Sequence, residues 1–342
     1  MRENIIIAVD AMGGDHAPAE IVKGSVLALS NKDMPNVQIK LFGPEDVVGA
    51  ELTKHDYDKA RIELIHAPEI ITMDESPTSA VRNKKDSSMM MAMYAVKEGQ
   101  ADALISAGNS GALLAGSTSI IKRIKGIERP ALGTPLPNAK GITFLLDSGA
   151  NMDCKPNYLV QFAKMGSIYM EYVHKKKNPR VALVNVGAER EKGNALTKEV
   201  YTLLEQEKSI NFIGNIEGRD IPRGECDVAV CDAFVGNVIL KYTEGMAGSL
   251  MGLIKEELMS TTISKMGALL AKGAFGNIKK RFDYAEVGGA PFLGLKKIVI
   301  KAHGSSDHRA IRSAIYQSYM FASLNLCEEI EKYCLQNQML ED

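Results

Sequence analysis

The stretch ADALISAGNSGALLAGSTSII, at residues 101–121, contains the pattern that decides the fold. An apolar run at 103–105 ends in a small polar turn, and apolar residues then recur at helical spacing. This order predicts a strand, a tight turn and a helix. Because the first N–H groups of a helix lack partners and lie at the positive end of its dipole, the turn could hold a phosphate. The alternative is that Gly108 and Gly111 only let the helix pack closely on the strand.

The same order of strand, polar turn and helix recurs along the chain. It predicts further strands at residues 5–9, 37–42, 61–66, 141–146, 180–186, 227–231 and 297–301. Strands that alternate with helices predict an α/β fold, with a large, mostly parallel sheet covered by helices on both faces. Ligands of such sheets bind beyond the carboxyl ends of the strands. We therefore expect six polar turns, those after residues 9, 105, 146, 186, 231 and 301, to lie at one edge of the sheet.

Composition narrows the class of protein. The 342 residues are 45% hydrophobic and 24% charged, which suffices for a large core and argues against disorder. Lys and Arg number 41 against 42 Asp and Glu, so the net charge of −1 creates no general field that would attract nucleic acid. Recognition by charge must therefore be local, and we expect no nucleic-acid partner.

Cysteines and apolar runs indicate the cell compartment. The five cysteines include no CxxC pair and lie at no metal-ligand spacing from a histidine, so we expect inert thiols in a reducing cytosol, with no metal and no cofactor. The apolar run at the start is too short for a signal peptide, and no window approaches the roughly 20 apolar residues of a membrane span. We therefore expect a cytoplasmic protein that attaches to a membrane, if at all, only at its surface.

The polar turns supply the candidate site residues. Carboxylates and glycines that follow a strand suit either the capping of backbone N–H groups or contact with a substrate. A lysine or histidine there can meet a bound phosphate, although a surface lysine and a structural histidine are the competing interpretations. The candidates for phosphate or substrate binding are Asp10, Gly13, Gly14, Asp15, Arg82, Gly108, Asn109, Ser110, Gly111, Asn151, Asn237 and Gly304, and the catalytic candidates are Lys192 and His303.

Two segments show no clear periodicity. Residues 67–86 suggest a loop with a basic cluster that includes Arg82, followed by Ser87 and Ser88 as possible caps of the next helix. The basic cluster suits a solvated helix entrance, or contact with a phosphate or an acidic partner. The prolines of GIERPALGTPLP, at residues 126–137, favour extended chain or an edge strand.

Residues 250–275 suggest an exposed amphipathic segment. Apolar residues recur at helical spacing on both sides of a break at Ser260-Thr261-Thr262, which predicts a helical hairpin with lysines along its flank. Such a hairpin could lie on anionic lipid, or it could be an ordinary dimerisation or core hairpin. The candidate membrane contacts are Leu250, Ile254, Leu258, Met266, Leu269 and Leu270.

Taken together, the motifs resemble those of the PlsX family, the acyl-acyl carrier protein:phosphate acyltransferases of bacterial phospholipid synthesis. The resemblance rests on AVDAMGGDHAP, SAGNSGALLAG, GIERPALGTPLP, LLDSGAN, NPRVALVNVGAEREKGN, DAFVGNVILK and VIKAHGSS, in family order over nearly the whole chain. One departure is visible at residues 232–237, where the family commonly has DGFTGN and this chain has DAFVGN. The chain thus lacks a glycine and a threonine hydroxyl in that turn.

The resemblance implies both a fold and an activity. It implies a three-layer α/β/α fold like that of isocitrate and isopropylmalate dehydrogenases, with one catalytic unit over residues 1–342 and a protruding hairpin at 246–282. It also implies a homodimer that transfers a long acyl chain from acyl carrier protein to inorganic phosphate. The acyl phosphate would then serve a membrane-bound glycerol-3-phosphate acyltransferase, so the expected location is cytoplasmic and peripheral to the membrane.

This chemistry needs no nucleophile from the enzyme, because phosphate is itself a nucleophile and the thiol that leaves has a pKa of about 8.5. The site must hold phosphate near the thioester and stabilise the developing oxyanion. We expect Lys192 and His303 to polarise phosphate or the thioester carbonyl, and the glycine turns to form the anion cradle. The acidic carrier protein would be steered by basic residues, which are Arg82, Lys84 and Lys85 or the 279–281 group. Two alternatives are an NAD-dependent dehydrogenase of the isopropylmalate type and a noncatalytic membrane-surface scaffold.

Overall fold

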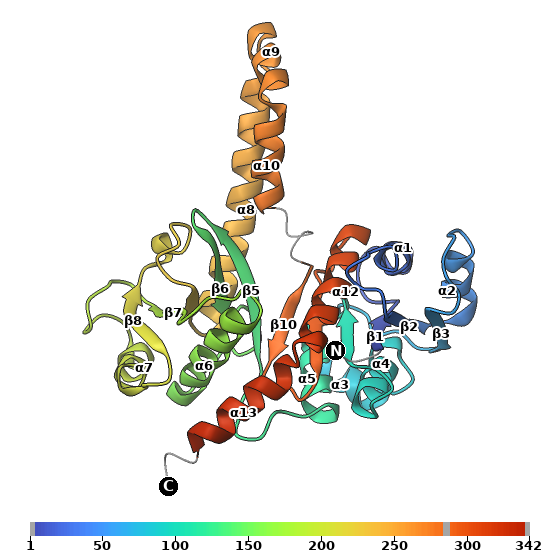
Figure 1. The fold of residues 1–342 in the computed structure, drawn as a ribbon, viewed down its shortest axis with the longest axis horizontal. Coiled ribbons are helices and arrows are strands. Elements are labelled where there is room, and N and C mark those ends of the chain that lie inside the picture. Colours follow the sequence, from blue (N-terminus) through green and yellow to red (C-terminus); the bar gives the residue numbers. More distant parts are fainter. Residues whose placement is uncertain (1–3, 283–287, 339–342) are drawn as a thin grey trace.

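The computed structural model describes residues 4–282 and 288–338, except for the side chains of residues 277, 279–282 and 335–338. Its strands form one large sheet in the order β3-β2-β1-β4-β11-β10-β5-β6-β9-β7-β8 (Figure 1). The strands are β1 (Ile5–Asp10), β2 (Val37–Gly43), β3 (Ile62–His66), β4 (Ala103–Ser106), β5 (Ala131–Asn138), β6 (Gly141–Leu146), β7 (Arg180–Val184), β8 (Asn211–Ile216), β9 (Val228–Val230), β10 (Ala290–Leu293) and β11 (Ile298–Lys301).

Helices cover both faces of this sheet, as the alternation of apolar runs predicts. The helices are α1 (Ala19–Ala28), α2 (Glu45–Leu52), α3 (Pro77–Asn83), α4 (Ser88–Lys97), α5 (Ser110–Ile120), α6 (Pro156–Tyr172), α7 (Ala195–Gln206), α8 (Ala233–Leu258), α9 (Thr262–Leu270), α10 (Lys272–Phe282), α12 (His308–Ser323) and α13 (Leu326–Gln338). Most strand pairs are parallel, which confirms the predicted α/β fold with a large, mostly parallel sheet.

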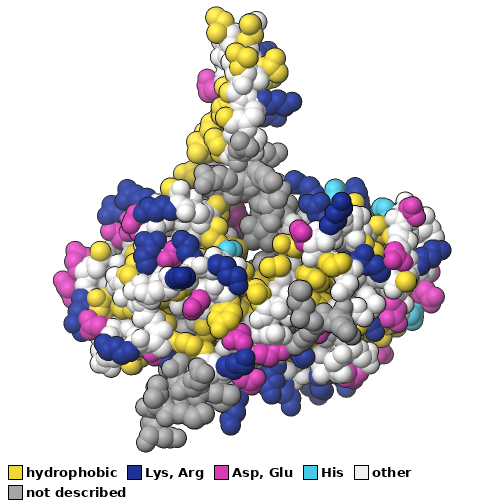
Figure 2. All heavy atoms as spheres, viewed as in Figure 1, with side chains coloured by type: hydrophobic (Ala, Val, Ile, Leu, Met, Phe, Trp, Pro, Cys, Tyr) yellow, Lys and Arg dark blue, Asp and Glu magenta, His cyan; other side chains and the backbone are white. Residues whose placement is uncertain are grey.

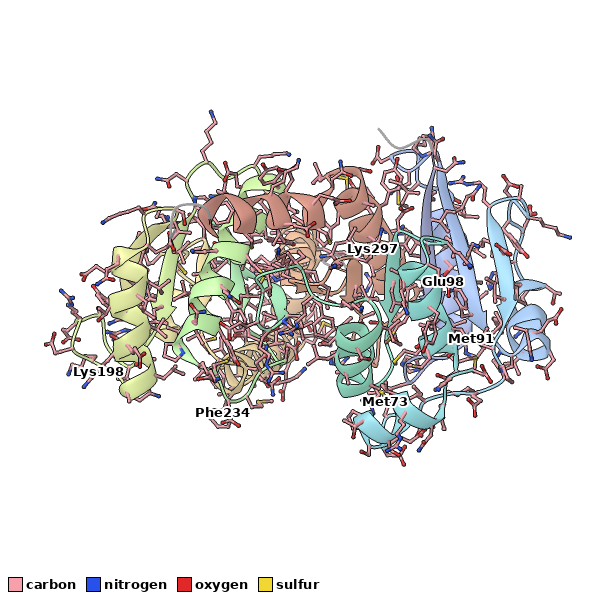
Figure 3. All side chains as sticks on the ribbon, turned by 90° about the horizontal axis from the view of Figure 1, so that it is seen from below. Met73, Met91, Glu98, Lys198, Phe234 and Lys297 are labelled. Carbon is pink, nitrogen blue, oxygen red and sulfur yellow. The ribbon has the colours of Figure 1, made fainter. Side chains whose placement is uncertain are left out.

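The core is divided by the sheet into separate apolar layers. In β1, Ile7 and Val9 pack on the face that α1, α6 and α12 cover, whereas Ala8 between them packs with α4 and α5 on the other face. This is the period-two alternation of a strand that is buried on both sides. A third apolar cluster lies between the strands β5 to β9 and the first turns of α8. Figure 3 shows, from below, the side chains that fill the space between the sheet and its helices.

The two halves of the sheet run in opposite directions. Strand β10 is antiparallel to both of its neighbours, β11 and β5, and β5 is antiparallel to β6. Strands β6, β9, β7 and β8 then continue parallel to one another. The turns after β1, β4 and β11 therefore lie at one edge, and those after β6, β7 and β9 at the other. The prediction that all six turns share one edge is wrong, because the three central antiparallel pairings reverse the strand direction.

Two local predictions need correction. The segment 127–137 is extended over most of its length, as one of the two interpretations predicts, but it is not an edge, because Ala131–Asn138 forms β5 in the middle of the sheet. Its Pro135 and Pro137 lie beyond the two residues that pair with β10, so their missing N–H groups break no bond on that side. The predicted loop at 67–86 contains the short helix α3, whose first residue is Pro77.

Helices α8, α9 and α10 extend away from the sheet (Figure 1). Helix α8 begins beneath β9, where the Asp232 side chain accepts a hydrogen bond from the N–H of Val235. The chain turns after Leu258, and Thr261 caps α9 through Ser264. Figure 2 shows hydrophobic side chains along these helices. The described ones with large exposed fractions are Tyr242, Met246, Leu250, Leu253, Ile263, Met266, Leu269 and Leu270.

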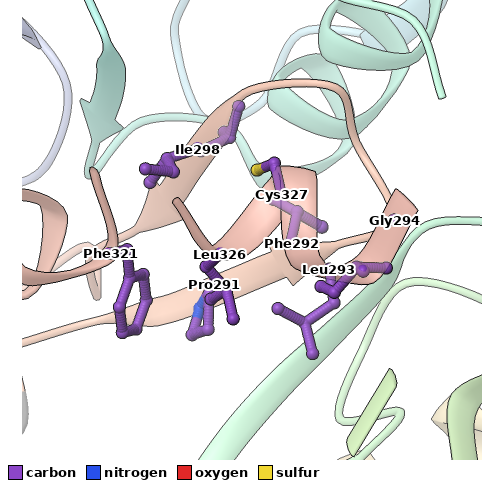
Figure 4. Close-up of a pocket in the computed structure, with 10 residues that line it drawn as sticks. Pro291, Phe292, Leu293, Gly294, Ile298, Phe321, Leu326 and Cys327 are labelled. Carbon is purple, nitrogen blue, oxygen red and sulfur yellow. The ribbon is translucent and has the colours of Figure 1, made fainter. Parts of the chain in front are cut away.

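Among the apolar residues outside α8 to α10, one group lines a small cavity and another lies in the core. Across residues 4–282 and 288–338, the search for a helix of membrane-spanning length and apolarity finds none. A small cavity between β10, β11, α12 and α13 is lined almost wholly by apolar side chains, including Phe292, Phe321 and Cys327 (Figure 4). It offers no group for catalysis. Met89, Met90 and Met93 of α4 are buried in the core, and Met91 is half-buried.

Candidate active site

Three polar turns meet where β1, β4 and β11 end. These strands are adjacent and parallel, and Lys301 at the end of β11 lies opposite Ser106 at the end of β4. The N–H of Asp15, in the turn after β1, donates to the carbonyl of Gly304, in the turn after β11, at 2.8 Å. Sequence reasoning placed these turns at one edge, and the structure brings them into direct contact.

A buried carboxylate organises the first of these turns. Asp10 accepts hydrogen bonds from the hydroxyls of Ser88 and Ser106, each at 2.6 Å, and from the N–H of Met12 at 3.3 Å. Burial raises the pKa of Asp10, while the hydrogen bonds from Ser106, Ser88 and Met12 act to lower it. Asp10 is only 2% exposed, so its carboxylate positions the turn and does not face solvent.

Ser88 shows a different role from the predicted one. Neither Ser87 nor Ser88 makes a capping hydrogen bond at the start of α4. The Ser88 hydroxyl is instead turned inward to Asp10, and the Ser87 hydroxyl donates to the carbonyl of Lys84. Helix α4 thus starts without a side-chain cap, and Ser88 links it to β1 through Asp10.

The glycines of these turns allow close approach of backbone segments. A Cβ atom at Gly13 would lie 2.6 Å from a carboxylate oxygen of Asp10 and 2.7 Å from the nitrogen of Gly108. Gly14 has φ +102°, and a Cβ there would lie 2.9 Å from the carbonyl oxygen of Gly304. The N–H of Gly108 donates to the hydroxyl oxygen of Ser106 at 3.0 Å. It is therefore directed into the protein and not toward an anion.

The start of α5 is capped by Asn109. Its side-chain oxygen accepts from the N–H of Ala112, and its side-chain nitrogen donates to the carbonyls of Thr72, Met73 and Glu75. The Asn109 side chain thus fixes the segment before α3 against α5. Gly111 serves the same contact, since a Cβ there would lie 2.5 Å from Pro77. Ser110 lies at the first position of α5 and is exposed.

His303 lies in the turn after β11 and reaches α8. Its Nδ1 accepts from the N–H of Ser305 at 3.2 Å, so the neutral ring carries its proton on Nε2. Nε2 lies 3.4 Å from the Nζ atom of Lys241, a residue that sequence reasoning did not select. Burial and then Lys241 lower the pKa of His303. Two donor groups from different elements therefore approach each other beside the three turns, which suits an anionic ligand. Lys241 is also ion-paired with Glu244 at 2.8 Å, so one carboxylate already stands beside these donors.

A second group of turns follows β6, β7 and β9. The buried Asp147 accepts from the N–H groups of Leu132, Gly149, Ala150 and Asn151. The side chain of Asn151 donates to Asp147 and to the carbonyl of Pro130, so it acts in the turn itself.

In the turn after β9, at DAFVGN, Ala233 is buried and Val235 packs against the third apolar cluster. The two departures from the family pattern are thus accommodated by packing. Asn237, on the first turns of α8, is half-buried.

Lys192 lies in the turn after β7. Its carbonyl accepts from the side chain of Asn185, and its own side chain is exposed. Within the described part of the chain, no hydrogen bond or ion pair joins Lys192 to His303, and the two follow strands of opposite direction. Of the basic cluster, Lys84 is paired with Glu75 at 2.6 Å and donates to the carbonyl of Ile70, while Arg82 is exposed. The side chains of residues 279–281 lie outside the described residues.

Four of the cysteines are poorly suited to act as covalent nucleophiles. Burial raises the pKa of Cys154 and of Cys226 to about 12, and it also raises the pKa values of Cys231 and Cys334. Within residues 4–282 and 288–338, no cluster of three or more His, Cys, Asp or Glu side chains could hold a metal ion. The site therefore offers backbone turns, hydroxyls and cations.

Comparison with solved structures defines the class. The chain shares its fold with the EutD phosphotransacetylase from Staphylococcus aureus, at a TM-score of 0.62 and 15% identity over 93% of this chain and 94% of that one. A phosphotransacetylase from Streptococcus pyogenes gives 0.59 and 17% over 94% and 95%. The fold and the polar turns thus define an α/β protein of phosphotransacetylase-like architecture.

The chain belongs to the family described as "Fatty acid synthesis protein", whose model matches residues 5–329. This confirms the resemblance to the PlsX family. The chain is 52% identical to a phosphate acyltransferase from Alkaliphilus oremlandii, over 95% of this chain and 96% of the relative. It is 51% identical to a phosphate acyltransferase from Clostridium botulinum, over 96% and 97%. A putative phosphate acyltransferase from Clostridium perfringens is 49% identical over 97% and 98%.

Proposed function

We propose that the protein is a phosphate acyltransferase that makes acyl phosphate from inorganic phosphate and a long-chain acyl-acyl carrier protein. The observation that carries this proposal is the identity of about one half, over almost the full length, to relatives named phosphate acyltransferase. The geometry agrees, because the edge formed by β1, β4 and β11 combines tightly packed turns with His303 and Lys241.

The reaction requires little covalent participation by the protein. An oxygen of phosphate attacks the carbonyl carbon of the thioester, and the negative charge moves onto the former carbonyl oxygen. The C–S bond then breaks, the electron pair leaves with the sulfur, and the thiolate takes up a proton. Because a thiol has a pKa of about 8.5, it leaves readily near neutral pH. The protein must bring the two reactants together and stabilise the oxyanion.

His303 and Lys192 are the proposed polarising groups. The neutral His303 ring donates from Nε2 beside the ammonium of Lys241, so a phosphate or oxyanion placed there would receive two hydrogen bonds. Lys192 supplies an exposed cation in the turn after β7, at the opposite edge of the sheet, so we propose that it contacts the substrate separately from His303. The anion cradle is assigned to the turns at Gly13-Gly14 and Gly108–Gly111, with the N-terminus of α5 as its dipole. The N–H of Gly108 takes no part in it, because it donates to Ser106.

The assembly is proposed from the exposed apolar residues. We assign the part of α8 nearest the sheet, where Phe234, Val238 and Tyr242 recur every four residues, to contact with a second copy of the chain. The more distant apolar residues, such as Leu269 and Leu270, are assigned to a membrane surface. Contact with the membrane would place acyl phosphate near the membrane-bound glycerol-3-phosphate acyltransferase. The protein would then be cytoplasmic and peripheral, with one catalytic unit over residues 1–342 and the hairpin at 246–282.

Thiol release from long-chain acyl-acyl carrier protein tests the activity. Purified protein should release thiol only when inorganic phosphate is present, and mass spectrometry should identify acyl phosphate. Lys192→Met and His303→Gln should each lower kcat at least about tenfold, whereas Lys198→Met, an exposed lysine on α7, should not. Thiol release that does not depend on phosphate and yields free fatty acid would contradict the proposal. Unchanged turnover in both variants would remove the two residues from the mechanism.

The two alternative functions, a dehydrogenase and a scaffold, predict different experimental results. A dehydrogenase of the isopropylmalate type would bind NAD, and a scaffold would bind acyl carrier protein without turnover. Neither is favoured by relatives that are named as acyltransferases.

A further inference from the structure

Lys301 is a charged residue at the end of an otherwise apolar strand. It follows Ile298, Val299 and Ile300 in β11, and its own exposed fraction is only 9%. Burying an ammonium group carries a large desolvation cost unless the group is well paired. A lysine in this position therefore needs a compensating set of contacts, and none of the roles assigned above involves it.

The contacts of Lys301 join two of the three turns. Its Nζ atom donates to the carbonyl of Ala107 at 3.0 Å and to the carbonyl of Ala302 at 2.6 Å. Ala107 begins the turn after β4, and Ala302 begins the turn after β11. A single ammonium group thus holds the first peptide of each turn.

Because peptide groups are planar, the contacts of Lys301 with two carbonyls also fix the direction of the N–H group in each of the two peptides. In a trans peptide the C=O and the N–H point in opposite directions. Because the carbonyl of Ala302 is directed inward to Lys301, the N–H of His303 is directed the opposite way, and the start of the His303 turn is fixed. The carbonyl of Ala107 is held in the same manner, while the N–H of that peptide, which belongs to Gly108, is held by Ser106.

The charge of Lys301 also matters for an anionic substrate. The neighbouring titratable and charged groups are Asp10 of β1, Asp15 of the following turn, His303, and Lys241 of α8. Two carboxylates beside the turns would repel a phosphate, and the Lys301 ammonium offsets part of their charge. Burial lowers the pKa of Lys301 to about 8, although Asp10 and Asp15 act to raise it.

We propose that Lys301 is a positioning residue for phosphate, which holds the turns after β4 and β11 in their binding geometry and offsets the charge of Asp10 and Asp15. This inference rests on the proposed function, since it names a determinant of phosphate binding in the same site. Lys301 acts through the two carbonyls and does not itself contact the reacting atoms.

Binding of inorganic phosphate, measured by titration calorimetry, tests this role without the need for turnover. Lys301→Met removes the charge and the donors but keeps an unbranched apolar stem, and its phosphate Kd should rise about tenfold or more, as expected for loss of a charge-assisted interaction. Lys296→Met, at an exposed lysine just before β11, is the matched control and should bind like the wild type. Circular dichroism and thermal unfolding establish that both variants fold.

The pH profile separates positioning from a purely structural role. The ratio of the Kd of Lys301→Met to that of the wild type should fall as pH rises through about 8, because the wild-type amine then loses its proton. The titration of phosphate itself cancels in this ratio. Lys301→Arg, which stays charged, should bind more tightly than Lys301→Met and keep its advantage above that pH.

The possible results of these measurements distinguish a failure of this inference from a failure of the proposed function. A folded Lys301→Met protein with wild-type Kd, or a Kd ratio that does not change with pH, would overturn the inference while leaving the proposed function intact. Wild-type protein that binds phosphate but forms no acyl phosphate would overturn the proposed function alone. Wild-type protein that does not bind phosphate would overturn both.

Discussion

Gly236 and Gly248 lie in the same helix but in opposite surroundings. A Cβ atom built at Gly236 would lie 1.9 Å from the carbonyl oxygen of Asp147 and 3.1 Å from the sulfur of Cys231. At Gly248, no atom of the residues that the structure describes lies within 4 Å of the corresponding position. At this scale the surroundings of each residue, and not its type, decide what a substitution does.

Replacing each of these glycines by alanine should therefore change stability in opposite directions. Gly236→Ala should lower the free energy of unfolding by about 1–3 kcal/mol or more, because the rigid backbone of residue 147 must move. Gly248→Ala should raise helix stability by up to about 1 kcal/mol, since it only restricts the unfolded chain and improves helix propensity. Urea-induced unfolding measures both, and equal effects would contradict the placement of α8 against β6.

His303 predicts a pH dependence of activity. Burial and Lys241 lower its pKa below the ordinary value of 6.5, so the ring is neutral at neutral pH and donates from Nε2. If this neutral donor assists the reaction, kcat/KM should fall as pH falls through the lowered pKa, below 6.5. His303→Gln should lose this acid limb, and an unchanged limb would assign it to another group.

Several residue roles were accessible from sequence and others were not. The polar turns after Val9 and Ile105 were recognisable from their position at strand ends. The partners of Asp10 were not, because Ser88 lies 78 residues away in sequence and meets it only through the packing of α4 on β1. Lys301 did give a signal, since it is the one charge in the strand IVIK.

At the scale of elements, most strand positions were predicted, but β8 and β10 were missed and the strand directions were not predicted. Apolar runs mark a strand but do not give its direction in the sheet. One cue to the reversal was present: residues 138–141 read NAKG, and Gly141 has φ +138° at the end of a tight β5–β6 connection. So short a connection allows only antiparallel strands. Strand β10 is joined to its antiparallel neighbour β11 by only four residues, 294–297, whereas its pairing with β5 joins strands distant in sequence, which no local pattern reveals.

Strands β7 and β9 are joined by an ion pair. Asp227, just before β9, accepts from the backbone N–H and the Nε of Arg180, at the start of β7, at 2.9 and 3.1 Å. Burial raises the pKa of Asp227, but the hydrogen bonds from Arg180 outweigh it and lower the pKa below 3.8. The paired carboxylate thus stabilises the fold above pH 3.8, and this contribution is lost as pH falls through the lowered pKa.

Asp227→Asn should make stability less sensitive to acid. At pH 7 the variant should lose about 1–3 kcal/mol of unfolding free energy, as expected for a weakened hydrogen-bonded pair. Between pH 4 and pH 2 the wild type should lose more stability than the variant, so the difference should shrink. Thermal unfolding across this range measures it, with Glu225→Gln, an exposed neighbour that pairs with Lys140, as the control. A constant difference would show that Asp227 is not titrating differently in the folded state.

At the scale of the whole molecule, the reversal of the sheet separates two groups of turns. The turns after β1, β4 and β11 share a buried polar network, whereas the turn after β7 carries Lys192 at the opposite edge. Beyond the sheet, α8 to α10 form the longest projection that Figure 1 shows among the described residues. The amphipathic pattern of residues 250–275 indicated helices, but their distance from the sheet depends on the length of α8.

The projecting helices should confer binding to lipid vesicles. Replacing Leu269 and Leu270 by serine should reduce co-sedimentation with vesicles that contain anionic lipid, because these side chains are 72% and 89% exposed and would lose apolar contact with the bilayer. Turnover with acyl-acyl carrier protein in solution should stay unchanged. Ile213→Ser, at an exposed apolar residue on the edge strand β8, is the control. Undiminished vesicle binding would assign membrane attachment to another surface.

The glycines of α8 also set its mechanical properties. Gly245, Gly248 and Gly252 lie between Lys241 and the far end of the helix, and none has a neighbour within 4 Å of an ideal Cβ position. Helices bend most easily at such unsupported glycines. A force applied at the far end of α8, near Leu258, should therefore bend this segment and leave the distance between Lys241 and His303 unchanged.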